Sequence, residues 1–149
     1  MRVLLQRVSA GSVTVDGEIS GKIESGFVAL VGVTHSDTEA EAAKLAQKTV
    51  NLRVFSDSGG KMNLSLLDVA GAVLVVSQFT LYADARKGRR PSYIQAAQPD
   101  LAEPLVRYYA DCLAQSGARP VEHGVFGALM QVAIHNDGPV TIMLDSDQL

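Results

Sequence analysis

The segment Ser77-Gln78-Phe79-Thr80 combines residue types that could bind and attack an ester carbonyl. The hydroxyl of Ser77 or Thr80 could act as a nucleophile, and free backbone N–H groups at a strand end could bind an oxyanion. A hydroxyl nucleophile also needs an oriented base, and a lone histidine is weak evidence for a triad. The plainer interpretation is the solvated polar end of a strand. The chain has three histidines: His35, His123 and His135.

A second candidate is the segment Asn136-Asp137-Gly138-Pro139-Val140-Thr141, which interrupts an apolar stretch over residues 126–144. Gly138 tolerates backbone angles that are closed to other residues, while Pro139 fixes its own φ and has no N–H group. Sheet packing would favour neither residue in the middle of a strand. Two interpretations are open: a hairpin turn between two strands, or a backbone device placed at a site.

Four cations, Arg86, Lys87, Arg89 and Arg90, lie within five positions shortly after the first candidate segment. The whole chain has 13 basic and 16 acidic residues and a net charge of −3, so its overall charge does not indicate a nucleic-acid-binding protein. The cluster is either a solvated surface loop or a local phosphate clamp, whose binding would weaken steeply with salt.

The bulk composition narrows the class of protein. A chain of 149 residues, 47% of them hydrophobic, predicts one soluble domain over residues 1–149. The single cysteine, Cys112, excludes an internal disulfide and is expected to be a small buried hydrophobe. The histidines and acids lack metal-ligand spacing, so we expect neither a metal nor a cofactor. The early charge at the N-terminus and the absence of a long apolar run predict a cytoplasmic protein without a membrane span.

Alternating and continuous apolar runs predict a chain rich in strands. Strands are expected over residues 1–15, 19–23, 27–33, 54–55 and 72–81, and twice within residues 121–144. The strand at 72–81 carries the first candidate segment at its end. Period-two alternation there would place Gln78 and Thr80 on one face, and Ser77 and Phe79 on the other.

Two helices are expected between these strands. Overlapping capping boxes within residues 36–41 predict the start of the first. Asp100 and Glu103 are expected to cap the second, which ends near residue 115. The order of the elements and a hairpin signal at residues 16–17 predict a mixed α/β fold with much antiparallel pairing.

Several shorter segments accompany the two candidates. They are Gln6-Arg7-Val8, Ser12-Val13-Thr14-Val15, Phe55-Ser56-Asp57, Gly60-Lys61-Met62-Asn63, Arg90-Pro91-Ser92 and Met130-Gln131-Val132. Together with Ser-Gln-Phe-Thr and Asn-x-Gly-Pro-Val-Thr, in this order, they make the chain resemble the D-aminoacyl-tRNA deacylase (D-tyrosyl-tRNA deacylase) family from end to end. Two positions depart from the pattern: Tyr93 stands where phenylalanine is usual, and His135 where an apolar residue is expected.

This resemblance implies antiparallel-rich, barrel- or roll-like sheets with two main helices, and a cytoplasmic homodimer. The implied reaction is hydrolysis of the ester that joins a D-amino acid to tRNA, or glycine mischarged on tRNA-Ala. The two active sites would lie at the subunit interface, where a cis Gly138–Pro139 of one subunit enters the pocket of the other. Two rigid backbone carbonyls there would occupy the place of an L side chain and so reject L-aminoacyl-tRNA.

The resemblance also implies roles for individual residues. Ser77, Gln78, Phe79 and Thr80 would hold the aminoacyl group. The remaining substrate-binding residues would be Asn136, Gly138, Pro139 and Thr141, together with Phe126 and Met130 at the terminal adenosine. From their own spacing, Phe126 and Met130 fit either the core or a base-stacking pocket. The tRNA contacts would be Arg86, Lys87, Arg89 and Arg90.

Two accounts of catalysis are open within this resemblance. In one, Thr80 is the nucleophile; in the other, the 2′-hydroxyl of the terminal adenosine activates water while the protein positions the ester. The lack of a credible base beside Thr80 favours the second account. Two other classes of protein are also open: an esterase with a threonine or serine nucleophile that needs no RNA, and a non-catalytic RNA-binding module that uses residues 86–90.

Overall fold

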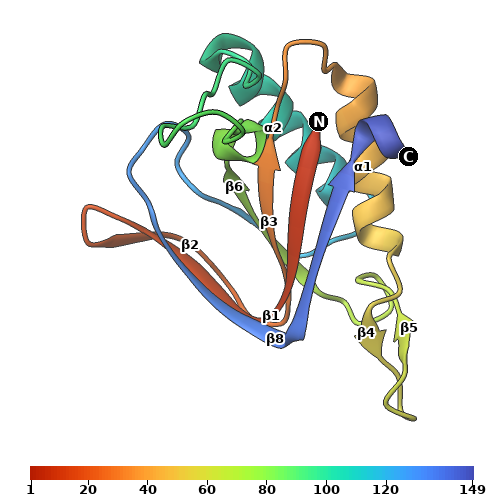
Figure 1. Ribbon diagram of the computed structural model, residues 1–149. Helices are drawn as coiled ribbons and strands as arrows, with labels where there is room; N and C mark the ends of the chain where they lie inside the picture. The colour runs from red at the N-terminus through yellow and green to blue at the C-terminus, as the bar shows by residue number, and fades with distance from the viewer.

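A computed structural model describes residues 1–149, which form a curled mixed sheet with two helices packed on one face (Figure 1). The strands follow the order β2-β1-β3-β6-β7, and β8 pairs with β1. The sheet strands are β1 (Arg2–Val15), β2 (Glu18–Ile23), β3 (Gly26–Gly32), β6 (Ala72–Ser77), β7 (Val121–His123) and β8 (Gln131–Asp145). The other elements are α1 (Glu39–Asn51), α2 (Pro99–Gln115), the small hairpin of β4 (Phe55–Ser56) and β5 (Met62–Leu64), and the 3₁₀ turns η1 (Phe79–Tyr82) and η2 (Ser146–Gln148).

The sheet curls because β1 and β8 are long paired strands that bend together (Figure 1). The first half of β1 pairs with β3 and its second half with β2, both antiparallel. By contrast, β3, β6 and β7 run parallel, so their carboxyl ends meet at one edge of the sheet. This arrangement of two helices and a partly closed, antiparallel-rich sheet confirms the predicted fold class.

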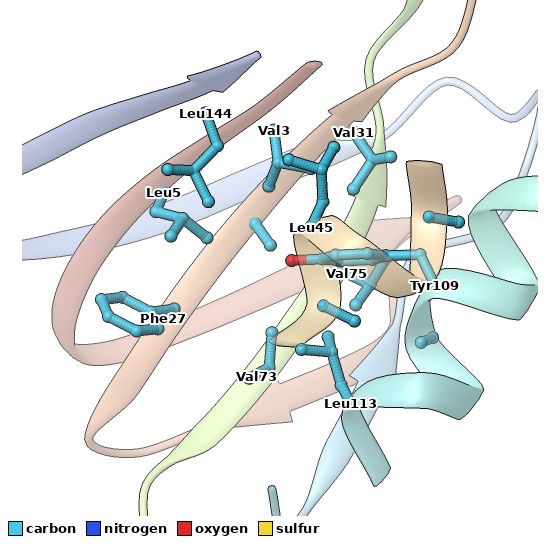
Figure 2. Close-up of a cluster of buried hydrophobic side chains, with 14 of the residues drawn as sticks. Val3, Leu5, Phe27, Val31, Leu45, Val73, Val75, Tyr109, Leu113 and Leu144 are labelled. Atoms are coloured by element: carbon cyan, nitrogen blue, oxygen red, sulfur yellow. The ribbon is translucent and has the colours of Figure 1, made fainter. Parts of the chain in front are cut away.

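The main core lies between the sheet and the helices. Alternate side chains of β1, such as Val3 and Leu5, point into it and are at most 1% exposed. Figure 2 shows these side chains beside Leu45 of α1 and Tyr109 and Leu113 of α2. A smaller cluster fills the other face of the curled sheet: Val8, Val13, Ile23, Val28, Ala72, Leu74 and Val76. Burial of each large side chain contributes roughly 1.5–3 kcal/mol, so both faces of β6 are held firmly up to its end.

The start of α1 follows the capping signal in the sequence, whereas the start of α2 does not. Of the two overlapping capping boxes, the second forms: Thr38 caps α1, and Glu41 accepts its backbone N–H. Hydrogen bonds from Thr38 hold the pKa of the Glu41 carboxyl below its usual value. The caps predicted for α2 are wrong, because the helix begins at Pro99 after Gln98, which makes no side-chain capping bond. A proline at the first position of a helix has no N–H to cap. Neither helix is long and apolar enough to span a membrane.

Two strand predictions are wrong, and both concern the candidate segments. Strand β6 ends at Ser77: the Gln78 backbone N–H makes the last bond of the ladder, to the Val31 carbonyl at 2.7 Å, and the chain then enters η1. The second apolar stretch does not fold back at Gly138. Instead, β8 continues through the Asn-Asp-Gly-Pro segment as one strand along β1, so the hairpin-turn interpretation is excluded.

Candidate active site

The first candidate segment lies at the edge where the carboxyl ends of β3, β6 and β7 meet, a common place for ligand sites in parallel sheets. Gly32 of β3 allows η1 to sit close to this edge, since an added Cβ would lie 3.0 Å from Leu81 and 3.1 Å from the Gln78 carbonyl oxygen. The first N–H groups of such a turn have no acceptor within the turn, so those of Phe79 and Thr80 can face a ligand.

A cavity of about 550 Å³ opens beside this edge. Ser77, Gln78 and Phe79 all line it, so the predicted division of the segment between two faces is wrong. Phe126 and Met130, from the loop between β7 and β8, line the same cavity, which brings both sequence-predicted adenosine contacts to the first segment. Thirteen of the 18 lining residues are hydrophobic and none is charged. Such a lining suits a flat, uncharged ring better than a phosphate.

Thr80 has no catalytic partner in the structure. Its side-chain oxygen accepts a hydrogen bond from the Gln78 amide, which cannot take up a proton. Ser77, His123 and Asp111 line a second hollow of about 330 Å³ next to the cavity, yet no hydrogen bond joins any two of them. The three residue types of a catalytic triad therefore lie near one another, but they do not form the hydrogen bonds that a triad requires.

The second candidate segment forms a wide bulge in β8. Gln6 pairs with Thr141 and Val8 with Asn136, so four residues of β8 lie opposite the single residue Arg7. The Asn136 side chain closes the bulge: its Oδ1 accepts the Val140 N–H at 3.0 Å, and its amide donates to the Val140 carbonyl at 3.3 Å. The Asn136 amide and the Gln6 amide each donate to the Thr141 hydroxyl at 3.4 Å.

Gly138 and Pro139 lie exposed at the tip of this bulge, joined by a cis peptide bond. Gly138 has a φ of 126°, a conformation that side-chain-bearing residues rarely adopt. A Cβ there would lie 2.9 Å from Nη2 of Arg7 and 3.0 Å from Cγ2 of Val140. The backbone at the tip is therefore held in a conformation that suits only glycine.

Arg7 supports the bulge from below, a role that the sequence motifs did not predict. Its guanidinium donates to the carbonyl of Asp137 at 3.1 Å and to the carbonyl of Val54, and it lies 3.3 Å from the Asp137 carboxylate. The side chain is only 10% exposed. Because Val3, Leu5 and residue 7 share the inward face of β1, a charged residue in that series is the sequence signal for this support.

Substitution of Arg7 by methionine should lower the free energy of unfolding by about 3 kcal/mol, because one buried and one partly buried carbonyl lose a charged donor while the volume is kept. Arg107→Met is the matched control: Arg107 is 72% exposed and pairs only with Glu103, so its loss should cost about 0.5 kcal/mol or less. Urea denaturation of the two variants measures the difference. Equal losses would contradict a supporting role for Arg7.

The two candidate segments do not meet within one chain. No residue of 136–141 lines the cavity. Arg7, opposite the bulge, pairs with Phe27, which pairs with Val73, four residues before Ser77. The bulge therefore lies about 13 Å from the site along the strands and about 14 Å across three strand spacings.

The basic cluster forms the tip of a closed loop beside η1 (Figure 1). Asp84 pairs with Arg86 at 2.7 Å, and this contact lowers the pKa of Asp84 to about 2. Lys87, Arg89 and Arg90 are exposed and have no acidic partner within 4.0 Å. Three cations of the loop are thus free to meet anions.

Of the remaining reactive side chains, none joins the site. His35 bonds the Ile94 carbonyl, and His135 lies exposed on β8 opposite Ala10. Cys112 is half-buried, where full burial was expected, and desolvation raises the pKa of its thiol, which keeps it protonated. No three His, Cys, Asp or Glu side chains cluster as metal ligands would.

Comparison with known proteins covers nearly the whole chain. A family model described as D-Tyr-tRNA(Tyr) deacylase matches residues 4–145. The D-aminoacyl-tRNA deacylase of Thermomicrobium roseum is 62% identical over 149 residues, which is 100% of this chain and 96% of the relative. That of Thermus aquaticus is 57% identical over 148 residues, or 99% of this chain and 97% of the relative.

Two solved structures share the fold. One, described as a c-Myc DNA unwinding element binding protein, has a TM-score of 0.91 and 40% identity, covering 97% of this chain and 98% of that one. The other, a probable eukaryotic D-amino acid tRNA deacylase, has a TM-score of 0.81 and 17% identity, covering 96% and 97%.

These matches define an enzyme of the hydrolase class, because deacylation is the hydrolysis of an acyl bond. The chain belongs to the D-Tyr-tRNA(Tyr) deacylase family.

Proposed function

We propose that this chain is an editing hydrolase that cleaves the ester of D-aminoacyl-tRNA, and of glycine mischarged on tRNA-Ala, and rejects L-aminoacyl-tRNA. The observation that carries the proposal is the pairing of an uncharged cavity at Ser77, Gln78 and Phe79 with an exposed, glycine-specific backbone tip at Gly138 and Pro139. Family membership supports the reaction, since the relatives at 57–62% identity are named D-aminoacyl-tRNA deacylases.

The site would be completed by a second copy of the chain. Within one chain the bulge and the cavity lie apart, and the tip at Gly138 and Pro139 is exposed. In a two-fold dimer the same surface serves both subunits, so each tip would enter the other subunit's cavity and form two equivalent sites. The Arg7 and Asn136 hydrogen bonds keep the tip rigid enough to act there.

The tip would read chirality by exclusion. A D and an L residue differ in the side of Cα that carries the side chain, so rigid carbonyl oxygens on one side block only the L form. Glycine has no side chain to block and would be accepted together with D residues of many sizes. A backbone filter therefore accounts for selectivity by handedness that does not depend on side-chain size.

Catalysis would come from positioning and from the substrate's own 2′-hydroxyl. Thr80 is bonded to the Gln78 amide and has no base, which disfavours a threonine nucleophile. The terminal adenine would occupy the cavity between Phe126 and Met130, while the Phe79 and Thr80 N–H groups bind the carbonyl oxygen of the ester. The 2′-hydroxyl beside that ester would then activate water.

One assay separates this proposal from its two rivals. We expect release of D-tyrosine from D-tyrosyl-tRNA and no hydrolysis of D-tyrosine methyl ester, because the RNA supplies the activating hydroxyl. A serine or threonine esterase would cleave both, and a serine-directed reagent would label it. A non-catalytic nucleic-acid-binding module, which the free cations of residues 86–90 would favour, would bind the tRNA and cleave neither. Either of these two results would overturn the proposal.

A further inference from the structure

Two exposed aromatic rings lie against each other at the mouth of the cavity. Phe79 and Tyr93 both line it, and they remain 55% and 42% exposed. Their centroids are 5.1 Å apart and their planes are inclined at 70°, an edge-to-face pair. Aromatic rings held half in water beside a nucleotide site are the side chains on which unpaired bases stack.

Local structure holds the backbone that carries both rings. Phe79 opens η1 directly after β6. Tyr93 follows Ser92, which exchanges two backbone hydrogen bonds of 2.8 and 2.9 Å with Asp84. On its other side, the Tyr93 carbonyl accepts the Ala96 N–H at 3.0 Å. The backbone from which the two rings project is therefore held by local hydrogen bonds, and each ring packs against the other.

The same hydrogen bonds tie this pair to the basic loop. Residues 84 and 92 close the loop whose free cations are Lys87, Arg89 and Arg90, and Tyr93 directly follows its closing residue, so the exposed cations and the aromatic pair belong to neighbouring parts of one surface. An uncharged cavity, a half-exposed aromatic pair in its lining and exposed cations in the adjoining loop are thus combined at this site. The end of a tRNA carries the matching groups: a terminal base, a preceding unpaired base and the phosphates that lead to the acceptor stem.

We propose that the Phe79–Tyr93 pair stacks the base of the nucleotide that precedes the terminal adenosine, and that Lys87, Arg89 and Arg90 contact the phosphates of this single-stranded end. The inference rests on the proposed function, because it takes the cavity as the place of the terminal adenine. In this proposal the outer rim of the site binds the RNA, and the inner part of the site binds the amino acid.

A double-mutant cycle between protein and RNA tests the stacking. Tyr93→Ala should lower kcat/KM for D-tyrosyl-tRNA about tenfold, and an abasic nucleotide at the penultimate position should cost the native protein about the same. Combined, the two changes should cost no more than either alone, because they remove the same contact. Tyr93→Phe keeps the ring and should behave like the native protein. Losses that multiply would overturn the proposal.

The stacking proposal can be tested even if the proposed function is wrong. A native protein that releases no D-tyrosine refutes the proposed function, and the same cycle is then measured from the Kd of uncharged tRNA, where non-additivity still supports stacking and additivity overturns it. Replacement of Lys87, Arg89 and Arg90 by glutamine should reduce the slope of log Kd against log salt by about 2, at roughly 0.7 for each phosphate contact. An unchanged slope would remove the cations from the proposal.

Discussion

A D-aminoacyl-tRNA whose terminal adenosine lacks its 2′-hydroxyl is expected to be hydrolysed at least about 100-fold more slowly than the normal substrate, the usual contribution of one general acid–base group. The physical reason is that no side chain of the cavity can replace this hydroxyl. The lining residues include no histidine and no acid. Single-turnover rates on the two substrates measure the effect, and competition between them checks that the modified tRNA still binds.

Thr80→Ala is the protein-side arm of this prediction. It should keep the rate within about tenfold, because it removes only the acceptor that orients the Gln78 amide. Thr80→Ser keeps the hydroxyl and serves as the matched control. A folded Thr80→Ala protein without activity, an active Thr80→Ser protein and normal hydrolysis of the 2′-deoxy substrate would together establish a threonine nucleophile instead.

Gly138→Ala is expected to lower the ratio of D to L hydrolysis about tenfold or more, equivalent to about 1.4 kcal/mol of discrimination. The added Cβ would lie 2.9 Å from the bonded guanidinium of Arg7 on a residue whose φ is 126°, so the bulge must shift. A shifted tip no longer places its carbonyl oxygens where an L side chain would go. The ratio of kcat/KM for D- and L-tyrosyl-tRNA is the measurement.

Gly60→Ala is the matched control for this variant. Gly60 also has a positive φ, 75°, but a Cβ there would meet nothing within 4 Å. Gly60→Ala should therefore introduce the same kind of backbone strain, that of a side chain at positive φ, and leave the ratio of D to L hydrolysis unchanged. If Gly138→Ala lowered both rates equally, the tip would support the site without filtering chirality, and the filter would be rejected.

Elements with local signals could be predicted from the sequence. Asp16 and Gly17 adopt the positive φ angles of a tight hairpin turn, and Thr38 and Glu41 form their capping box, because each signal depends on residues that are adjacent in the chain. The end of β6 could not be predicted, since the small Gly32 that leaves room for η1 belongs to another strand.

The candidate site could likewise be predicted from the sequence only in part. The residue types of both segments are visible in the sequence, and the structure brings Ser77, Gln78, Phe79, Phe126 and Met130 to one cavity. The bulge could not be told from a hairpin turn, because its closure depends on the Asn136 side chain and on Arg7 from a distant strand. The sequence shows Tyr93 only as a departure from the family pattern. Its contact with Phe79 could not be predicted, because the fold brings the two residues together.

The most direct test of the account measures the release of tyrosine from two substrates that differ only in one stereocentre. D-tyrosyl-tRNA and L-tyrosyl-tRNA are incubated with the same preparation of the native protein, and each rate is corrected for spontaneous hydrolysis. The account predicts rapid release of D-tyrosine and release of L-tyrosine at the spontaneous rate. Equal rates on the two substrates, or no release of D-tyrosine, would contradict it.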